Sequence, residues 1–206
     1  MHQSRKNATV FGIFSWYISY IIKRGFYAHH FNKIILNKQE SILLLANHFS
    51  WWDGFLMFQL NRLFFKKNFH VLVTEEDYKK HWFLKYLGAF AAENTGKDVI
   101  STLLHAGQLL NDRNNMVLLF PQGKTNSVYV SSIAFEKGIM QVVNESKKKF
   151  QIVFAATVID YSAKKPCLYT HLKTWEAEEY ISLQLLKREY NKHYDEAAKT
   201  LTTNGA

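Results

Sequence analysis

The sequence predicts an α/β fold in which a mixed, mostly parallel sheet is flanked by helices and preceded by a separate N-terminal helix. Short apolar runs alternate along the chain with longer segments whose apolar residues recur at helical spacing. A chain of 206 residues with 48% hydrophobic residues is long enough for one domain with a substantial core. Only 2 prolines and no low-complexity run argue against long unstructured linkers.

The first predicted element is a helix over residues 9–22, TVFGIFSWYISYII, with Arg5 and Lys6 before it and Lys23 and Arg24 after it. As a helix it would be about 21 Å long, shorter than the hydrocarbon core of about 30 Å, so we do not expect it to span a membrane. No small-residue cleavage site follows it, so we do not expect a signal peptide. Aromatic rings between cations are typical of a helix lying in the lipid interface. The alternative is an amphipathic helix packed on the protein's own core.

We therefore expect residues 1–30 to form a membrane-interfacial segment and residues 31–206 to form the main domain. In that domain, aliphatic and β-branched runs predict strands, and segments of helical periodicity predict helices. The predicted strands are residues 41–46, 69–74, 116–120, 151–161 and 167–175, and the predicted helices are residues 53–65, 75–87, 98–111, 132–144 and 182–200. A link containing His29 and His30 is expected before the first strand, and a short apolar connection at residues 88–92.

The charge balance predicts an anionic partner. The chain has 26 Lys and Arg against 17 Asp and Glu, a formal net charge of +9. The basic residues are scattered without a helix-turn-helix, zinc or RNP signature, so we expect a lipid membrane surface and no nucleic acid. The single cysteine, Cys167, excludes an internal disulfide, and the histidines lack metal-ligand spacing, so no metal site is expected.

The chemistry is predicted where the first strand meets the following helix, in the stretch LLLANHFSWWDGF of residues 43–55. Sites in α/β sheets gather beyond the carboxyl ends of strands, and His48 and Asp53 lie in the turn expected there. A neutral imidazole can take a proton from a hydroxyl when a carboxylate binds its other nitrogen. Because no G-x-S-x-G motif is present, the nucleophile is expected to be the substrate's hydroxyl. The alternative is that Asp53 caps the helix and His48 is a hydrogen-bonded turn residue.

Two motifs resemble blocks of the glycerolipid and lysophospholipid acyltransferase family. The sequence NHFSWWD, from Asn47 to Asp53, resembles its NHxxxxD block, and FPQGK, from Phe120 to Lys124, resembles its FPEGT block. The resemblance covers roughly residues 41–160. It implies a peripheral enzyme on the cytoplasmic face of a membrane that moves a fatty acyl group from acyl-CoA or acyl carrier protein to a lipid acceptor. It also implies His48 as the base, Asp53 as its partner, and no cofactor besides the acyl donor.

The sequence departs from the family pattern where the acceptor's phosphate is expected to bind. The second block keeps Gly88 and Phe90 but has Glu93 and Asn94 where an arginine is usual, and a carboxylate repels phosphate. In the third block Gln122 replaces a glutamate. We therefore expect an acceptor other than lysophosphatidate, such as a lipoamino acid, a glycolipid or a carotenoid glycoside. The alternatives are a 1-acylglycerol-3-phosphate acyltransferase proper that uses Lys124 as its cation, an inactive lipid-binding homologue, and hydrolysis of the thioester by water.

The residues expected to contact the substrates come from these three blocks. Trp51 and Trp52 are expected to wall an acyl or acceptor pocket, with core packing as the alternative. Backbone N–H groups of the turn at residues 121–123 are expected to stabilise the oxyanion. The full predicted set is Asn47, Trp51, Trp52, Gly88, Phe90, Glu93, Phe120, Pro121, Gln122, Gly123 and Lys124.

Overall fold

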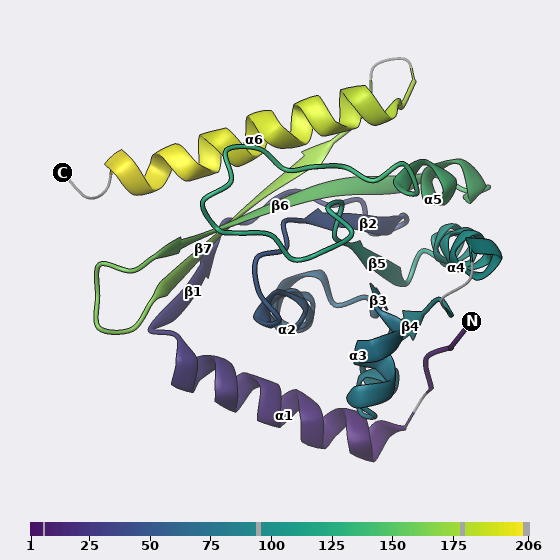
Figure 1. Ribbon diagram of the computed structural model, residues 1–206, viewed down its shortest axis with the longest axis horizontal. Coiled ribbons are helices and arrows are strands. Elements are labelled where there is room, and N and C mark those ends of the chain that lie inside the picture. Colours follow the sequence, from purple (N-terminus) through teal and green to yellow (C-terminus); the bar gives the residue numbers. More distant parts are fainter. Residues whose placement is uncertain (6, 94–95, 178–179, 204–206) are drawn as a thin grey trace.

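A seven-stranded sheet forms the centre of the computed structural model, which describes residues 1–5, 7–93, 96–177 and 180–203 (Figure 1). The strand order is β1-β7-β6-β2-β5-β3-β4, and neighbours run parallel except for the antiparallel pair β6 and β7. The mixed, mostly parallel sheet predicted from the sequence is thereby confirmed. The strands are β1 (Ala28–Phe31), β2 (Ser41–Ala46), β3 (Asn68–Val73), β4 (Ala89–Ala91), β5 (Asn115–Leu119), β6 (Phe150–Asp160) and β7 (Cys167–Trp175).

Helices cover both faces of this sheet (Figure 1). Ile42 and Leu44 of β2 belong to a core cluster shared with α1 and α2, whereas Leu43 and Leu45 belong to the cluster shared with α4, α5 and α6. This alternation follows from the two-residue period of a strand. The helices are α1 (Ala8–Gly25), α2 (Trp52–Leu60) with a π-helical continuation (Asn61–Phe65), α3 (Glu75–Lys80), a 3₁₀ turn (Leu84–Leu87), α4 (Gly96–Leu109), α5 (Ile139–Glu145) and α6 (Leu183–Thr203).

The N-terminal helix α1 has one buried and one exposed face. Asn7 caps it by accepting a hydrogen bond of 3.0 Å from the N–H of Val10. Ile18 and Ile22 are buried in the core that α1 shares with α2. Large side chains project from the other face, namely Ile13, Trp16, Tyr17 and Tyr20, whereas the partly exposed Phe11 packs edge-to-face on Phe58 on the core side. Among the described helices, none is both long and apolar enough to cross a bilayer.

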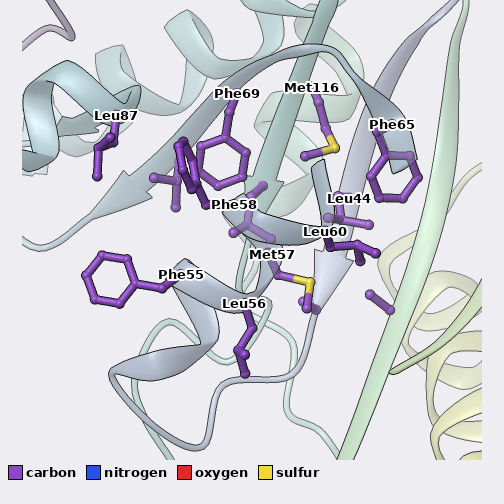
Figure 2. Packing of buried hydrophobic residues seen from close by; sticks show 14 of the residues in the cluster. Leu44, Phe55, Leu56, Met57, Phe58, Leu60, Phe65, Phe69, Leu87 and Met116 are labelled. Carbon is purple, nitrogen blue, oxygen red and sulfur yellow. The ribbon is translucent and has the colours of Figure 1, made fainter. Parts of the chain in front are cut away.

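Figure 2 shows the part of the core where side chains of α2 pack against the sheet. Met57, Phe58 and Leu60 of α2 are at most 2% exposed and meet Leu44 of β2 and Phe69 of β3. Such close packing fixes the angle at which α2 leaves the end of β2. The turn that joins the two elements is therefore anchored on both sides.

Two segments predicted as loops are edge strands. Residues 88–92 were expected to form a connection, yet Ala89–Ala91 pairs in parallel with β3 as strand β4. The link with His29 and His30 contains β1, which pairs with β7. Both strands are too short to show periodicity, and their pairing is decided by neighbours that are distant in sequence. The predicted boundary between residues 30 and 31 falls inside β1.

Two predicted helices are shorter than expected. The helix predicted at residues 132–144 begins only at Ile139 and ends at Glu145. Before it, Asn191 of α6 accepts from the N–H of Ile133 and donates to its C=O, which leaves that backbone without helical partners. The helix predicted at residues 75–87 is interrupted at His81 and resumes only as the 3₁₀ turn. Gly88 ends that turn with φ +97°, and a Cβ there would lie 1.9 Å from the carbonyl oxygen of Phe69, so only glycine fits.

Candidate active site

The turn between β2 and α2 brings His48 and Asp53 together. The Nδ1 atom of His48 lies 3.1 Å from Oδ2 of Asp53. The same carboxylate accepts from the N–H groups of Phe49 (2.6 Å) and Ser50 (2.8 Å) and from the Ser50 hydroxyl (2.9 Å). Asp53 is only 7% exposed, and its carboxylate is stabilised by these donors and by its place in the first turn of α2. Because the carboxylate of Asp53 accepts from Nδ1–H of His48, the second ring nitrogen, Nε2, remains for a substrate.

The alternative in which Asp53 caps α2 describes the structure only in part. The N-cap position is held by Trp51, whose side chain makes no capping bond, and Asp53 lies inside the first turn. Its carboxylate does bind backbone N–H groups, but those of the preceding turn. The same contacts that order the turn therefore also orient the imidazole.

The ring of Phe120, which directly follows β5, also holds the imidazole of His48 in place. The two rings stack with centroids 4.1 Å apart and an angle of 17° between their planes. Because β5 pairs in parallel with β2, both residues lie at the same edge of the sheet. The His48 side chain is 22% exposed, so it remains within reach of a substrate.

A cavity of about 520 Å³ opens beside His48, a volume that suits a small-molecule or lipid chain. Most of its wall is apolar and comes from α2, β3, the 3₁₀ turn and β4. The apolar side chains at its wall include Phe55, Phe58, Phe69, Val71, Leu84 and Leu87. The polar residues that line it, besides His48, are Thr74, Glu75, Asp77, Glu93, Lys124 and Thr125.

Five of the predicted substrate-contacting residues line this cavity together with His48. Trp51 stands over Phe55, with ring centroids 4.5 Å apart, and is 45% exposed. Glu93 is about half exposed, and its carboxylate lies 3.1 Å from the amino group of Met1. The five are Trp51, Glu93, Phe120, Gly123 and Lys124. Asn94, named beside Glu93 from the sequence, lies outside the described residues.

The other six predicted substrate-contacting residues do not line the cavity. Trp52 packs edge-to-face on Phe26 behind the turn, and Phe90 is a core residue at 1% exposure. Gly88 ends the 3₁₀ turn, and the carbonyl of Pro121 accepts from the N–H of Glu136. Asn47 and Gln122 are buried and use their amide groups on the backbone. Sequence alone does not separate residues that form a site from residues that support it.

Asn47 continues the strand pairing of β2 by means of its side chain. Its Nδ2 donates to the carbonyl of Thr157 (2.9 Å), and the N–H of Thr157 donates to its Oδ1 (2.7 Å). The hydroxyl of Thr157 then contacts that of Thr170 (2.8 Å), which contacts Nε2 of His29 (2.8 Å). Burial, followed by the nearby His30, lowers the pKa of His29 to about 4, so His29 is neutral at physiological pH. A polar chain thus crosses four strands to the residue before His48.

The turn after β5 provides fewer free N–H groups than the sequence suggests. The N–H of Gly123 donates to the carbonyl of Phe120 at 3.1 Å and closes the turn. Gly123 has φ +66°, and a Cβ would meet Glu136 at 2.9 Å. The N–H of Gly123 is therefore occupied, and the expectation that it binds the oxyanion is not supported by this geometry.

The cavity wall was not predicted from the sequence. Phe58, Phe69 and Leu87 belong to the same apolar patterns as the core, and nothing local distinguishes a side chain beside a cavity from one in a filled core. Glu75 and Asp77 lie in the first turn of α3, where acidic residues favour any helix, so their presence in the sequence does not indicate a cavity. Within the described residues, no group of three or more His, Cys, Asp or Glu side chains is placed to hold a metal ion.

The comparison with protein-family models agrees with these motifs. No match was found among curated proteins. The model of the family described as Acyltransferase matches residues 29–159, well over half of the chain. This stretch runs from β1 to the end of β6 and contains both His48 and Asp53 as well as the turn after β5. The chain therefore belongs to the acyltransferase family of the glycerolipid and lysophospholipid type.

Proposed function

We propose that the protein is a peripheral membrane O-acyltransferase that moves a fatty acyl group from acyl-CoA or acyl carrier protein to the hydroxyl of a lipid-like acceptor. One observation carries the proposal: His48, held by Asp53 at 3.1 Å, lies at an apolar cavity of about 520 Å³. An apolar cavity suits an acyl chain, because burial of each methylene is worth about 0.8 kcal/mol. The histidine supplies the base that a hydroxyl acceptor needs.

The proposed reaction is direct transfer. Nε2 of His48 removes the proton from the acceptor hydroxyl while the hydroxyl oxygen attacks the thioester carbonyl carbon. Asp53 keeps the other ring nitrogen protonated and stabilises the imidazolium that forms. When the tetrahedral intermediate collapses, the C–S bond breaks and the thiolate takes the proton from His48. The ester and the free thiol are the products, and no acyl group is attached to the protein.

The charges around the cavity favour an acceptor without phosphate. Among the described residues that line it, Lys124 is the only Lys or Arg, whereas three carboxylates lie there, on Glu75, Asp77 and Glu93. Glu93 contacts the amino group of Met1, which shows that an ammonium group fits beside this carboxylate. This charge balance at the cavity wall favours a neutral or amine-bearing head group over a phosphate monoester.

An acceptor panel tests this assignment. With one acyl donor, the wild-type protein is expected to acylate hydroxyl lipids with amino-acid or sugar head groups at least about ten times faster than lysophosphatidate, an energy difference of about 1.4 kcal/mol. Initial rates and product masses give the comparison. Glu93→Gln is measured on the same panel, because it should reduce the ratio of the rate with phosphate-free lipids to the rate with lysophosphatidate without removing activity. A faster rate with lysophosphatidate than with every phosphate-free lipid would contradict the proposed acceptor class.

The exposed face of α1 supports attachment to a membrane surface. Trp16 and Tyr20 stack at 5.9 Å and are 69% and 48% exposed, and Lys23 and Arg24 follow in the last turn. Rings at head-group depth beside cations are the pattern of an interfacial helix. The buried face of α1 packs on the protein's own core, and the interfacial role is proposed for the opposite, exposed face alone.

Removal of the two exposed rings is expected to weaken membrane binding. The double variant Trp16→Ser, Tyr20→Ser should bind anionic vesicles at least about ten-fold less tightly, since burial of one large apolar side chain is worth about 1.5–3 kcal/mol. Vesicle pelleting at rising salt measures it, and binding of both proteins should fall with salt. Tyr180→Ser is the matched control, because this exposed ring precedes α6, which packs on the face of the sheet opposite to α1. Equal binding by the double variant would contradict the interfacial role.

A further inference from the structure

The segment after β5 encloses the backbone of His48 as well as its ring. The N–H of His48 donates to Oε1 of Gln122 at 2.5 Å. The carbonyl of His48 accepts from the N–H of Asn126 at 3.0 Å and from Nε2 of Gln122 at 3.4 Å. Together with the ring of Phe120, these contacts hold His48 from residues 120–126.

Gln122 makes these contacts from a buried position. Its side chain is only 1% exposed, and it does not line the cavity. A buried amide satisfies both of its polar atoms only when one partner donates and another accepts. His48 offers both, because its N–H and its C=O are spaced like those of a strand partner.

The same arrangement, which we call an amide clamp, recurs in this protein: a side-chain amide accepts from the N–H and donates to the C=O of one other residue. Asn47 clamps Thr157 next to the site, and Gln151 clamps Asn37 at the other end of the sheet, with bonds of 2.8 and 2.7 Å. In each case the amide takes the place of a strand neighbour and fixes a piece of backbone. Gln122 is the member that fixes the residue carrying the base.

We propose that Gln122 is a positioning residue for His48 and does not bind the acceptor. The inference rests on the proposed function, since it assigns how the base is held. An amide suits this position because it both accepts from the N–H and donates to the C=O of His48, whereas a charged carboxylate has no donor for that carbonyl. The departure from the family motif is thus compatible with an active site.

The consequence for catalysis is a loss of placement. Without Gln122, the N–H of His48 loses its partner and the turn can move relative to the cavity. A displacement of about 1 Å of a reacting group costs on the order of 10²-fold in rate. Gln122→Met, which keeps the volume and removes both hydrogen bonds, is therefore expected to lower kcat about 10²-fold and to leave KM for the acceptor unchanged.

The variant Gln122→Glu gives a signature that a purely structural role would not give. In its neutral form the new carboxyl group both accepts and donates, as the amide does; in its charged form it repels the carbonyl of His48. As pH rises through the pKa of that carboxyl group, the donor is lost. The ratio of variant to wild-type kcat should therefore fall as pH rises, whereas the ratio for Gln122→Met should stay constant.

The experiment compares wild type, Gln122→Met, Gln122→Glu and the control Gln151→Met. The control removes an amide clamp of the same kind far from His48, so its kcat should equal that of the wild type, whatever it costs in stability. Unchanged kcat in Gln122→Met, a raised acceptor KM at unchanged kcat, or a flat pH ratio for Gln122→Glu would overturn the assignment.

A second readout needs no substrate. Hydrogen exchange of the His48 backbone N–H, followed by NMR, should be slow in the wild type and in Gln151→Met and at least ten-fold faster in Gln122→Met. If the wild type transfers no acyl group, the proposed function fails while this exchange still decides whether Gln122 holds His48. Equal exchange in wild type and Gln122→Met would overturn the positioning role.

Discussion

Replacement of His48 by alanine is expected to lower the rate of acyl transfer about 10²- to 10⁴-fold, the usual contribution of a positioned general base. The variant leaves the cavity and the acyl-binding wall in place, so binding of the thioester should persist. Initial rates with saturating donor and acceptor measure the effect. The loss should appear in kcat, because the imidazole acts on the proton that moves in the transition state.

The control is that the His48→Ala variant folds and binds vesicles like the wild type. The His48 side chain is partly exposed and makes one side-chain hydrogen bond, to Asp53, so the thermal midpoint and vesicle binding should change little. Transfer by His48→Ala at the wild-type rate would show that another group takes the proton. The dyad would then be a structural feature of the turn.

Replacement of Asp53 by asparagine is the second large effect. All four contacts of this carboxylate come from donors: the His48 ring, two backbone N–H groups and the Ser50 hydroxyl. An asparagine side chain has one acceptor and must direct an NH₂ group at a donor. We expect a loss in kcat of about 10²- to 10⁴-fold, since the tautomer and charge of His48 are no longer fixed. The unfolding free energy should fall by about 1–3 kcal/mol, the cost of a buried donor without a partner.

Asp112→Asn provides the matched control for Asp53→Asn. Asp112 also accepts from a backbone N–H, that of Asn114 at 2.9 Å, but it is exposed and precedes β5 at the opposite end of the sheet. Urea unfolding and kcat, measured on both variants, separate the two effects. A fully active Asp53→Asn enzyme would contradict the role given to the carboxylate, whatever its stability.

Most of the sheet, and the turn that brings the candidate residues together, could be predicted from sequence. The strands β2, β5 and β6 contain the apolar runs ILLLA, MVLL and IVFAA, and such runs indicate strands that are buried on both faces. The pair His48 and Asp53 was predicted because it lies in the turn expected between the first strand and the following helix, beyond the carboxyl end of that strand. That turn exists, and its hydrogen bonds bring the two side chains together.

The elements that were missed depend on distant partners. Strand β1 forms by pairing with β7, which lies far away in the sequence. The segment before α5 is not helical, because the side chain of Asn191 binds the N–H and the C=O of Ile133. The support role of Gln122 was also invisible, because a motif residue was read as a substrate contact. Hydrogen bonds between residues 74 positions apart leave no local pattern in the sequence.

The central claim is direct transfer from a thioester to a lipid hydroxyl in the cavity beside His48. The most direct measurement is thiol release by the wild-type protein from acyl-CoA and from acyl carrier protein, with and without a total lipid extract, combined with the mass of the lipid product. The account predicts that thiol is released only when the extract is present and that an equal amount of acylated lipid forms. Release without an acceptor would indicate hydrolysis by water, and no release from either donor would indicate a lipid-binding protein without turnover; either result would contradict the account.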